Sequence, residues 1–183
     1  KQFSLEVDGW TPINGEEAIE TWESGVDMSD GGTVHASDGN QFIELNSASH
    51  FESAKGVERE INTEEGTLYT LTLDVAPRPG FGEEYNSFDI VVDGVVVGSW
   101  SGSSPKDQGL DWNSIEVNFY GSSEPQDIQL VSTGTHHNSG RGVLVDNLVI
   151  EEVNGIELAV QHLFGETGFG VGVNATFVGG DVD

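Results

Sequence analysis

The sequence predicts an all-β fold, an antiparallel β-sandwich or jelly roll. Apolar and polar residues alternate with a period of two in about eight segments, spaced about ten residues apart. Gly, Asp, Asn and Ser join these segments, as in the turns of antiparallel sandwiches. No segment has a convincing helical period. With 183 residues, 36% of them hydrophobic, the chain can bury the core of one full-sized domain.

The expected strands can be read in order along the chain. In residues 18–23, Ile19 and Thr21 share one face, while Glu20 and Trp22 share the other. Residues 58–65 predict a strand followed by a turn. Asp93-Gly94 predicts a tight hairpin, because these residues tolerate positive φ. The other expected strands are residues 41–46, 67–76, 88–92, 95–100, 112–120, 126–132 and 143–151.

The chain changes character after Glu152. Residues 1–152 are expected to form the β-sandwich, which is the ligand-binding domain. Residues 153–183 are interrupted by glycine and predict an extra strand or the start of a following module, with a flexible end at 179–183. Lys1-Gln2-Phe3 shows no signal-peptide pattern. We therefore expect a monomeric module of a larger chain.

The charge is strongly acidic, with 32 Asp and Glu against six Lys and Arg, and a formal net charge of −26. Phosphate backbones and anionic membranes would be repelled, which excludes nucleic-acid binding and attraction to such membranes. No apolar stretch is long enough for membrane insertion. The acids can keep a protein soluble in a salty extracellular medium, and some of them can hold Ca²⁺. Because cysteine is absent, calcium could replace disulfides as a staple.

Catalytic patterns are weak, so the sequence predicts a protein that is not an enzyme. There is no cysteine nucleophile and no Gly-x-Ser-x-Gly elbow. Adjacent histidines His136 and His137 would point to opposite faces of an extended segment, which disfavours zinc. Paired carboxylates for glycoside hydrolysis arise by chance among 32 acids and carry little information.

Calcium has better support, although no EF-hand pattern is present. Residues 27–32 and 37–40 are acidic turns with glycine, and the second contains Asp38 and Asn40. Asp146 shares the parity of Leu144, Leu148 and Ile150 in the last strong strand, and a core-facing charge is costly unless it is paired or metal-bound. The alternative for Asp146 is a bulge that frees it to solvent. We expect a structural calcium ligand.

Polar strand positions predict a ligand platform. Glu20, Trp22 and Glu44 are expected on outward faces, with Asp74 and Arg78 beside them. An aromatic ring and a guanidinium next to carboxylates supply a stacking surface and an anion clamp. The alternatives are a salt bridge from Arg78 to Glu83 or Glu84, and core packing for Trp22.

Four segments carry a resemblance to a known group: residues 20–25, 38–46, 69–78 and 142–150. They resemble the galactose-binding-like sandwiches of carbohydrate-binding modules and of large bacterial repeat-in-toxin (RTX) adhesins. They look most similar to the calcium-dependent peptide-binding domains of such adhesins. The similarity covers about residues 9–152, and residues 38–46 are its most specific part.

This resemblance implies an extracellular adhesion module in which bound Ca²⁺ helps to hold the free C-terminal carboxylate of a peptide on another cell. A bound cation would reverse the local sign of an acidic surface. The alternative function is a carbohydrate-binding module for cell-surface or polysaccharide glycans. The residues that match the shared motifs of this group are Glu20, Asp38, Asn40, Gln41, Glu44, Arg78 and Asp146. We add Asn86, Asp89 and the loop from His136 to Arg141 as candidates because of their positions in the sequence. The expected ligand-binding residues are Glu20, Trp22, Asn40, Gln41, Glu44, Arg78, Asn86 and Arg141, and the expected metal ligands are Asp38, Asn40, Asp89 and Asp146.

Overall fold

The computed structural model describes residues 1–13, 18–46, 56–136, 140–153, 156–163 and 170–177. The last two ranges are described by their backbone. The chain divides into two compact units, Lys1–Glu151 and Glu152–Asp183. The flexible end expected at residues 179–183 lies outside the described residues.

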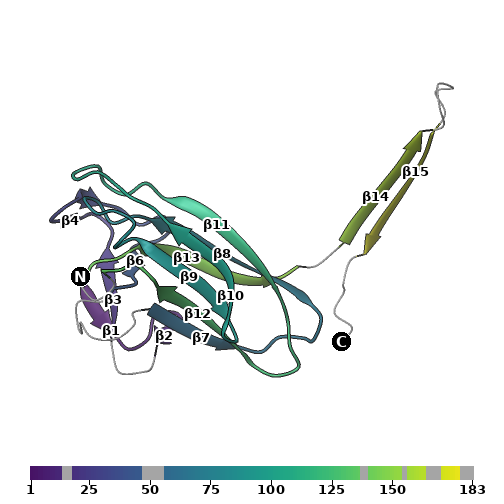
Figure 1. The fold of residues 1–183 in the computed structure, drawn as a ribbon, viewed down its shortest axis with the longest axis horizontal. Coiled ribbons are helices and arrows are strands. Elements are labelled where there is room, and N and C mark those ends of the chain that lie inside the picture. Colours follow the sequence, from purple (N-terminus) through teal and green to yellow (C-terminus); the bar gives the residue numbers. More distant parts are fainter. Residues whose placement is uncertain (14–17, 47–55, 137–139, 154–155, 164–169, 178–183) are drawn as a thin grey trace. The chain divides into compact units, whose positions relative to one another are not determined.

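The first unit consists of antiparallel strands arranged in two main sheets (Figure 1), which confirms the predicted all-β sandwich. The six-stranded sheet has the order β1-β3-β6-β13-β8-β11, and the five-stranded sheet has the order β10-β9-β12-β7-β2. The strands of the first sheet are β1 (Gln2–Ser4), β3 (Ile19–Glu23), β6 (Gln41–Glu44), β13 (Leu144–Glu152), β8 (Leu68–Ala76) and β11 (Asn113–Tyr120). Those of the second are β10 (Val95–Ser101), β9 (Ser87–Val92), β12 (Gln126–Ser132), β7 (Gly56–Ile61) and β2 (Thr11–Pro12).

Each long segment of alternating residues forms a strand close to its expected position, and the Asp93-Gly94 hairpin is confirmed. Asp93 and Gly94 have φ of 49° and 79° and connect β9 to β10, where Val92 pairs with Val95. Four short strands were not predicted: β1, β2, β4 (Val26–Met28) and β5 (Gly32–Val34). Segments of two or three residues are too short to show a period of two.

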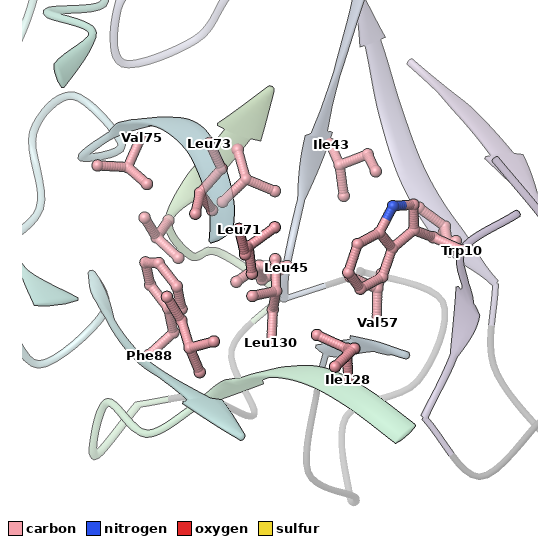
Figure 2. Close-up of a cluster of buried hydrophobic side chains, with 14 of the residues drawn as sticks. Trp10, Ile43, Leu45, Val57, Leu71, Leu73, Val75, Phe88, Ile128 and Leu130 are labelled. Carbon is pink, nitrogen blue, oxygen red and sulfur yellow. The ribbon is translucent and has the colours of Figure 1, made fainter. Parts of the chain in front are cut away.

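The main core lies between the two sheets (Figure 2). Leu71, Leu73 and Val75 of β8 face it together, as their spacing predicts, and they are at most 1% exposed. Phe88 and Leu130 approach from the other sheet. Burial of these apolar surfaces is the dominant favourable term in the stability of such a sandwich.

A second core covers the outer face of the six-stranded sheet. Trp22 and Phe42 pair directly across β3 and β6, and they form this core together with Leu144 and Ala76. The β4–β5 hairpin places Met28 and Val34 over them, at 1% and 0% exposure. The outward position expected for Trp22 was therefore wrong. Both faces of β3 are buried, because a neighbouring hairpin covers the face that period-two alternation assigns to solvent.

A bulge in β13 changes which residues face the core. Asn147 has φ of 50° and is exposed. Leu144 packs in the second core, whereas Leu148 packs against the main core. The single parity expected for Leu144, Asp146 and Leu148 was therefore wrong, since one extra residue in a strand reverses the alternation after it.

The second unit contains one antiparallel pair, β14 (Ile156–Leu163) and β15 (Gly170–Phe177). Ile156 pairs with Phe177, and Leu163 pairs with Gly170. Among the described residues of the chain, no helix has the length and apolar character needed to cross a membrane.

The second core generates a stability prediction. Met28→Ala should lower the free energy of unfolding by about 2–5 kcal/mol, because it leaves a cavity under the β4–β5 hairpin. Val95→Ala, at a side chain that is 64% exposed, should change it by less than about 0.5 kcal/mol. Urea denaturation measures both. Equal effects of the two substitutions would contradict a packed second core.

Candidate functional site

A cluster of buried charges lies on the outer face of the six-stranded sheet. Glu20 of β3 and Glu44 of β6 are directly opposite each other and are 0% and 1% exposed. Arg78, which follows β8 and is 5% exposed, donates through Nη1 to Oε1 and Oε2 of Glu44 at 2.5 Å and 2.6 Å. The Lys1 ammonium lies 3.1 Å from Oε1 of Glu20. We call Lys1, Glu20, Glu44 and Arg78 the buried ion cluster.

Two further groups complete the coordination of the Glu44 carboxylate. The indole N–H of Trp22 donates to Oε2 at 2.9 Å, and the backbone N–H of Gly142 donates to Oε1 at 2.9 Å. The carboxylate thus joins β3, β6, the end of β8 and the segment before β13. Since a buried carboxylate is tolerated only when it is paired and hydrogen-bonded, these contacts explain how Glu44 can lie inside the protein.

Burial raises the pKa of Glu44 from 4.5 to about 7. The positive charge of Arg78 opposes this rise, and the carboxylate of Glu20 adds to it. The outward positions expected for Glu20, Glu44 and Arg78 were wrong, because all three side chains are buried. The salt bridge of Arg78 is made with Glu44, and not with Glu83 or Glu84.

Asn86 and Arg141 lie at the edge of the same cluster. The Asn86 side chain is fully buried, accepts from the backbone N–H of Arg78 at 2.7 Å, and donates to the Phe81 carbonyl at 3.1 Å. The Arg141 guanidinium lies 5.4 Å from the ring centre of Phe81. Six of the expected ligand-binding residues therefore lie in or beside this cluster, and Trp22 and Arg78 bind Glu44 directly. The six are Glu20, Trp22, Glu44, Arg78, Asn86 and Arg141.

A pocket opens beside this cluster, between β6 and β13. The described pairs between these strands are Leu144 with Glu44 and Val145 with Ile43. Beyond them the bulge at Asn147 interrupts β13. The cavity has a volume of about 480 Å³. We call it the β6–β13 pocket; its lining is Val7, Asp8, Trp10, Thr21, Asp38, Gly39, Asn40, Gln41, Phe42, Ile43, Val145, Asp146, Asn147 and Leu148.

The lining of the β6–β13 pocket combines apolar walls with oxygen-rich and amide side chains. Val7 and Leu148 are partly exposed and supply apolar surface, while Asn40 and Gln41 are exposed and supply amides. Three carboxylates lie along it, from Asp8, Asp38 and Asp146. Among the described residues that line it, none is Lys, Arg or His. Hydroxyl groups, which both donate and accept, match such a lining.

Asp146 is anchored by the backbone. Its Oδ2 accepts from the N–H groups of Ser37 and Asp38 at 2.8 Å and 3.0 Å, and its Oδ1 accepts from Asn147 at 2.9 Å. Burial raises the pKa of Asp146, and these three donors partly offset the rise. The carboxylate therefore fixes the 37–38 turn against β13, which shapes one wall of the pocket.

The four expected calcium ligands do not form one site. Asp38, Asn40 and Asp146 share the β6–β13 pocket, but Asp89 lies on β9 of the other sheet, where it accepts from the Ser99 hydroxyl at 2.6 Å. In the described ranges, no three His, Asp or Glu side chains come together as a metal-binding group. Asp38, Asn40 and Asp146 alone offer fewer ligands than the six to eight oxygens that calcium takes, so a Ca²⁺ ion at this pocket would need water molecules to complete its coordination.

Sequence reasoning missed several residues of the pocket. Asp8 and Trp10 lie in a tight turn in which the backbone N–H groups of Val7 and Trp10 each donate to the other residue's carbonyl at 2.9 Å. Asp8-Gly9 is a turn dipeptide, so this turn could have been expected. Its approach to β6 and β13 could not, because that contact joins segments far apart in the chain. Asn147 was noted beside Asp146, but not as a pocket residue.

Comparison with known proteins gives similarity of fold only. No protein-family model matches the chain, and no curated protein matches it. The CBM22-1 xylan-binding domain of Paenibacillus barcinonensis Xyn10C is similar at TM-score 0.49 and 15% identity, covering 82% of this chain and 92% of that domain. A family 35 carbohydrate binding module from Clostridium thermocellum is similar at TM-score 0.47 and 13% identity, covering 81% and 95%.

A third similar structure is the Podospora anserina GH26-CBM35 β-(1,4)-mannanase, at TM-score 0.41 and 13% identity. It covers 73% of this chain, and this chain spans 27% of the mannanase. These structural neighbours include carbohydrate-binding modules, and they share the sandwich architecture. Similarity of this size carries no information about the ligand, which depends on the side chains of this chain.

The buried ion cluster generates a pH prediction. Between pH 4.5 and about 7, folded Glu44 keeps a proton that the unfolded chain has lost, so rising pH removes stability. Wild type should lose on the order of 3 kcal/mol across this interval relative to Glu44→Gln, which cannot titrate. Urea denaturation at pH 5, 6, 7 and 8 gives both curves. Parallel curves would show that Glu44 does not titrate in this range.

Proposed function

We propose that this chain is a non-catalytic, extracellular carbohydrate-binding module whose β6–β13 pocket binds a neutral glycan. The observation that carries the proposal is the lining of that pocket: amides, carboxylates and partly exposed apolar side chains, with no cationic side chain among its described residues. Its volume of about 480 Å³ falls within the range of about 300–1,000 Å³ that is usual for small-molecule sites.

The polar groups of the pocket suit sugar hydroxyls. Carboxylates of Asp8 and Asp38 can accept hydrogen bonds, while the amides of Asn40 and Gln41 can both accept and donate. The apolar faces of a sugar ring need apolar walls, which the partly exposed side chains of Val7 and Leu148 supply. A neutral glycan can form hydrogen bonds with these groups without adding negative charge to a pocket that already contains carboxylates.

A peptide carboxylate suits the pocket less well. The peptide hypothesis relied on bound Ca²⁺ and on Arg78 as an anion clamp, but Arg78 is 5% exposed and its Nη1 is bound to Glu44. Without a bound cation, a free C-terminus in the β6–β13 pocket would meet the carboxylates of Asp8, Asp38 and Asp146. Like charges at short range oppose binding, so we place glycans before peptides.

Titration calorimetry distinguishes these ligands. The probes are the neutral hexasaccharides xylohexaose, mannohexaose and cellohexaose, and peptides with free and with amidated C-termini. The proposal is supported if at least one hexasaccharide gives a heat of binding and if the peptides give no heat that is lost when their C-termini are amidated. Binding of the free peptide alone would overturn it.

Substitutions in the pocket provide a residue-level prediction. Asn40→Ala and Gln41→Ala should each weaken binding of the responding hexasaccharide by about three- to tenfold, because each removes a hydrogen-bonding group worth about 0.5–1.5 kcal/mol. Both side chains are exposed, so stability should hardly change. The matched control is Asn118→Ala, an exposed amide on β11 outside the pocket. Equal affinities of all three variants would exclude the β6–β13 pocket as the site.

Calcium is proposed separately as a stabilising cofactor, with support from the net charge of −26 and from the oxygens of Asp38, Asn40 and Asp146 around one pocket. If Ca²⁺ binds the native state, millimolar CaCl₂ should raise the melting temperature and EDTA should reverse the rise. Differential scanning calorimetry, with MgCl₂ as the ionic-strength control, measures the effect. Identical melting temperatures in CaCl₂, MgCl₂ and EDTA would remove calcium from the proposal.

A further inference from the structure

A second cavity is lined mainly by the loop that joins β10 to β11. Its volume is about 220 Å³. We call it the Trp100 pocket, lined by Pro77, Trp100, Gly102, Ser103, Ser104, Pro105, Gln108, Gly109, Asp111 and Asn113. It shares no lining residue with the β6–β13 pocket.

The indole of Trp100 is held on two sides. Trp100 pairs with Phe88 across β10 and β9, and their rings are 6.1 Å apart at a 38° tilt. A Cβ on Gly102 would lie 2.6 Å from Cη2 of Trp100, so the Gly102 backbone rests directly on the ring. Trp100 remains partly exposed and lines the pocket. It is therefore a fixed aromatic wall.

The loop over Trp100 is also fixed, through backbone hydrogen bonds to two other loops. Gly102 donates to the Asn86 carbonyl at 3.0 Å, and Ser104 donates to the Phe81 carbonyl at 3.2 Å. Further along, Asp107 donates to the Asp30 carbonyl at 2.9 Å and Gly109 donates to the Gly31 carbonyl at 3.1 Å. A site that is formed before the ligand arrives spares the entropic cost of ordering it.

The lining of the Trp100 pocket suits a small, neutral, polar ligand that has one apolar face. Trp100, Pro77 and Pro105 supply apolar surface. Gln108 and Asn113 supply amides, and Asp111 is the single charged residue among the described residues of the lining. The cavity is smaller than the range of about 300–1,000 Å³ for drug-sized ligands, which limits an occupant to about one sugar ring.

We propose that the Trp100 pocket is a second glycan subsite, which binds one neutral sugar ring against Trp100 with its hydroxyls on Gln108 and Asn113. The proposal rests on the proposed function for its ligand class. It adds a second, separate binding site on the same module. Two sites on one module strengthen binding to a polymer relative to a short oligosaccharide, when one chain can reach both.

The test is an NMR titration of the ¹⁵N-labelled chain with the three hexasaccharides named above. The Trp100 indole N–H signal is assigned from Trp100→Phe, which keeps an aromatic ring against Phe88. We expect the Trp100 indole and the side-chain amides of Gln108 and Asn113 to shift on titration. The same shifts should persist in the double variant Asn40→Ala/Gln41→Ala, in which the β6–β13 pocket is impaired.

Substitutions then test how much each amide contributes to binding at the Trp100 pocket. Gln108→Ala and Asn113→Ala should each weaken the Trp100 response by about three- to tenfold and leave the β6–β13 response unchanged. Asn118→Ala, on the same strand as Asn113 but outside the pocket, should change neither response.

The outcomes separate the two proposals. Shifts in the β6–β13 pocket with none at Trp100 would overturn the second subsite and leave the proposed function standing. Trp100 shifts that disappear in the double variant would also overturn it, because the site would not be independent. A Trp100 response to peptides alone would overturn it, and the absence of any response to sugars would overturn both proposals.

Discussion

The ion pair between Arg78 and Glu44 is the interaction on which the outer face of the six-stranded sheet depends. It joins the end of β8 to the centre of the sheet, and the same carboxylate binds Trp22 of β3 and the backbone before β13. Glu44 and Arg78 are both buried, so removal of either partner would leave a charge without compensation in a medium of low polarity. The pair therefore specifies how four segments meet.

This arrangement separates structural charge from the surfaces that can bind. Three of the six basic residues lie in or beside the buried ion cluster: Lys1, Arg78 and Arg141. Lys1 forms an ion pair with Glu20, and Arg78 forms one with Glu44. The two pockets, in contrast, have no basic side chain in their described linings. A chain with a net charge of −26 thus offers cavities suited to uncharged partners.

Much of the fold was predictable because period-two alternation reports which residues share a face. The strands of the main core follow it, as Leu71, Leu73 and Val75 show. The candidate site was harder to predict, although the sequence did select Glu20, Trp22, Glu44 and Arg78 as a group. Their types and spacing indicated that they belong together, but nothing in the spacing showed that all four side chains would be buried.

The sequence by itself determined the all-β class, the positions of the long strands and the Asp93-Gly94 turn, because each depends on residues close together in the chain. Only the tertiary structure decided that the outer face of the six-stranded sheet is covered, that the bulge at Asn147 reverses the parity of β13, and that Asp8 and Trp10 meet Asn40 at one pocket. These features depend on contacts between segments far apart in sequence. No local pattern encodes such contacts, since they arise from the packing of hairpins and turns onto a sheet.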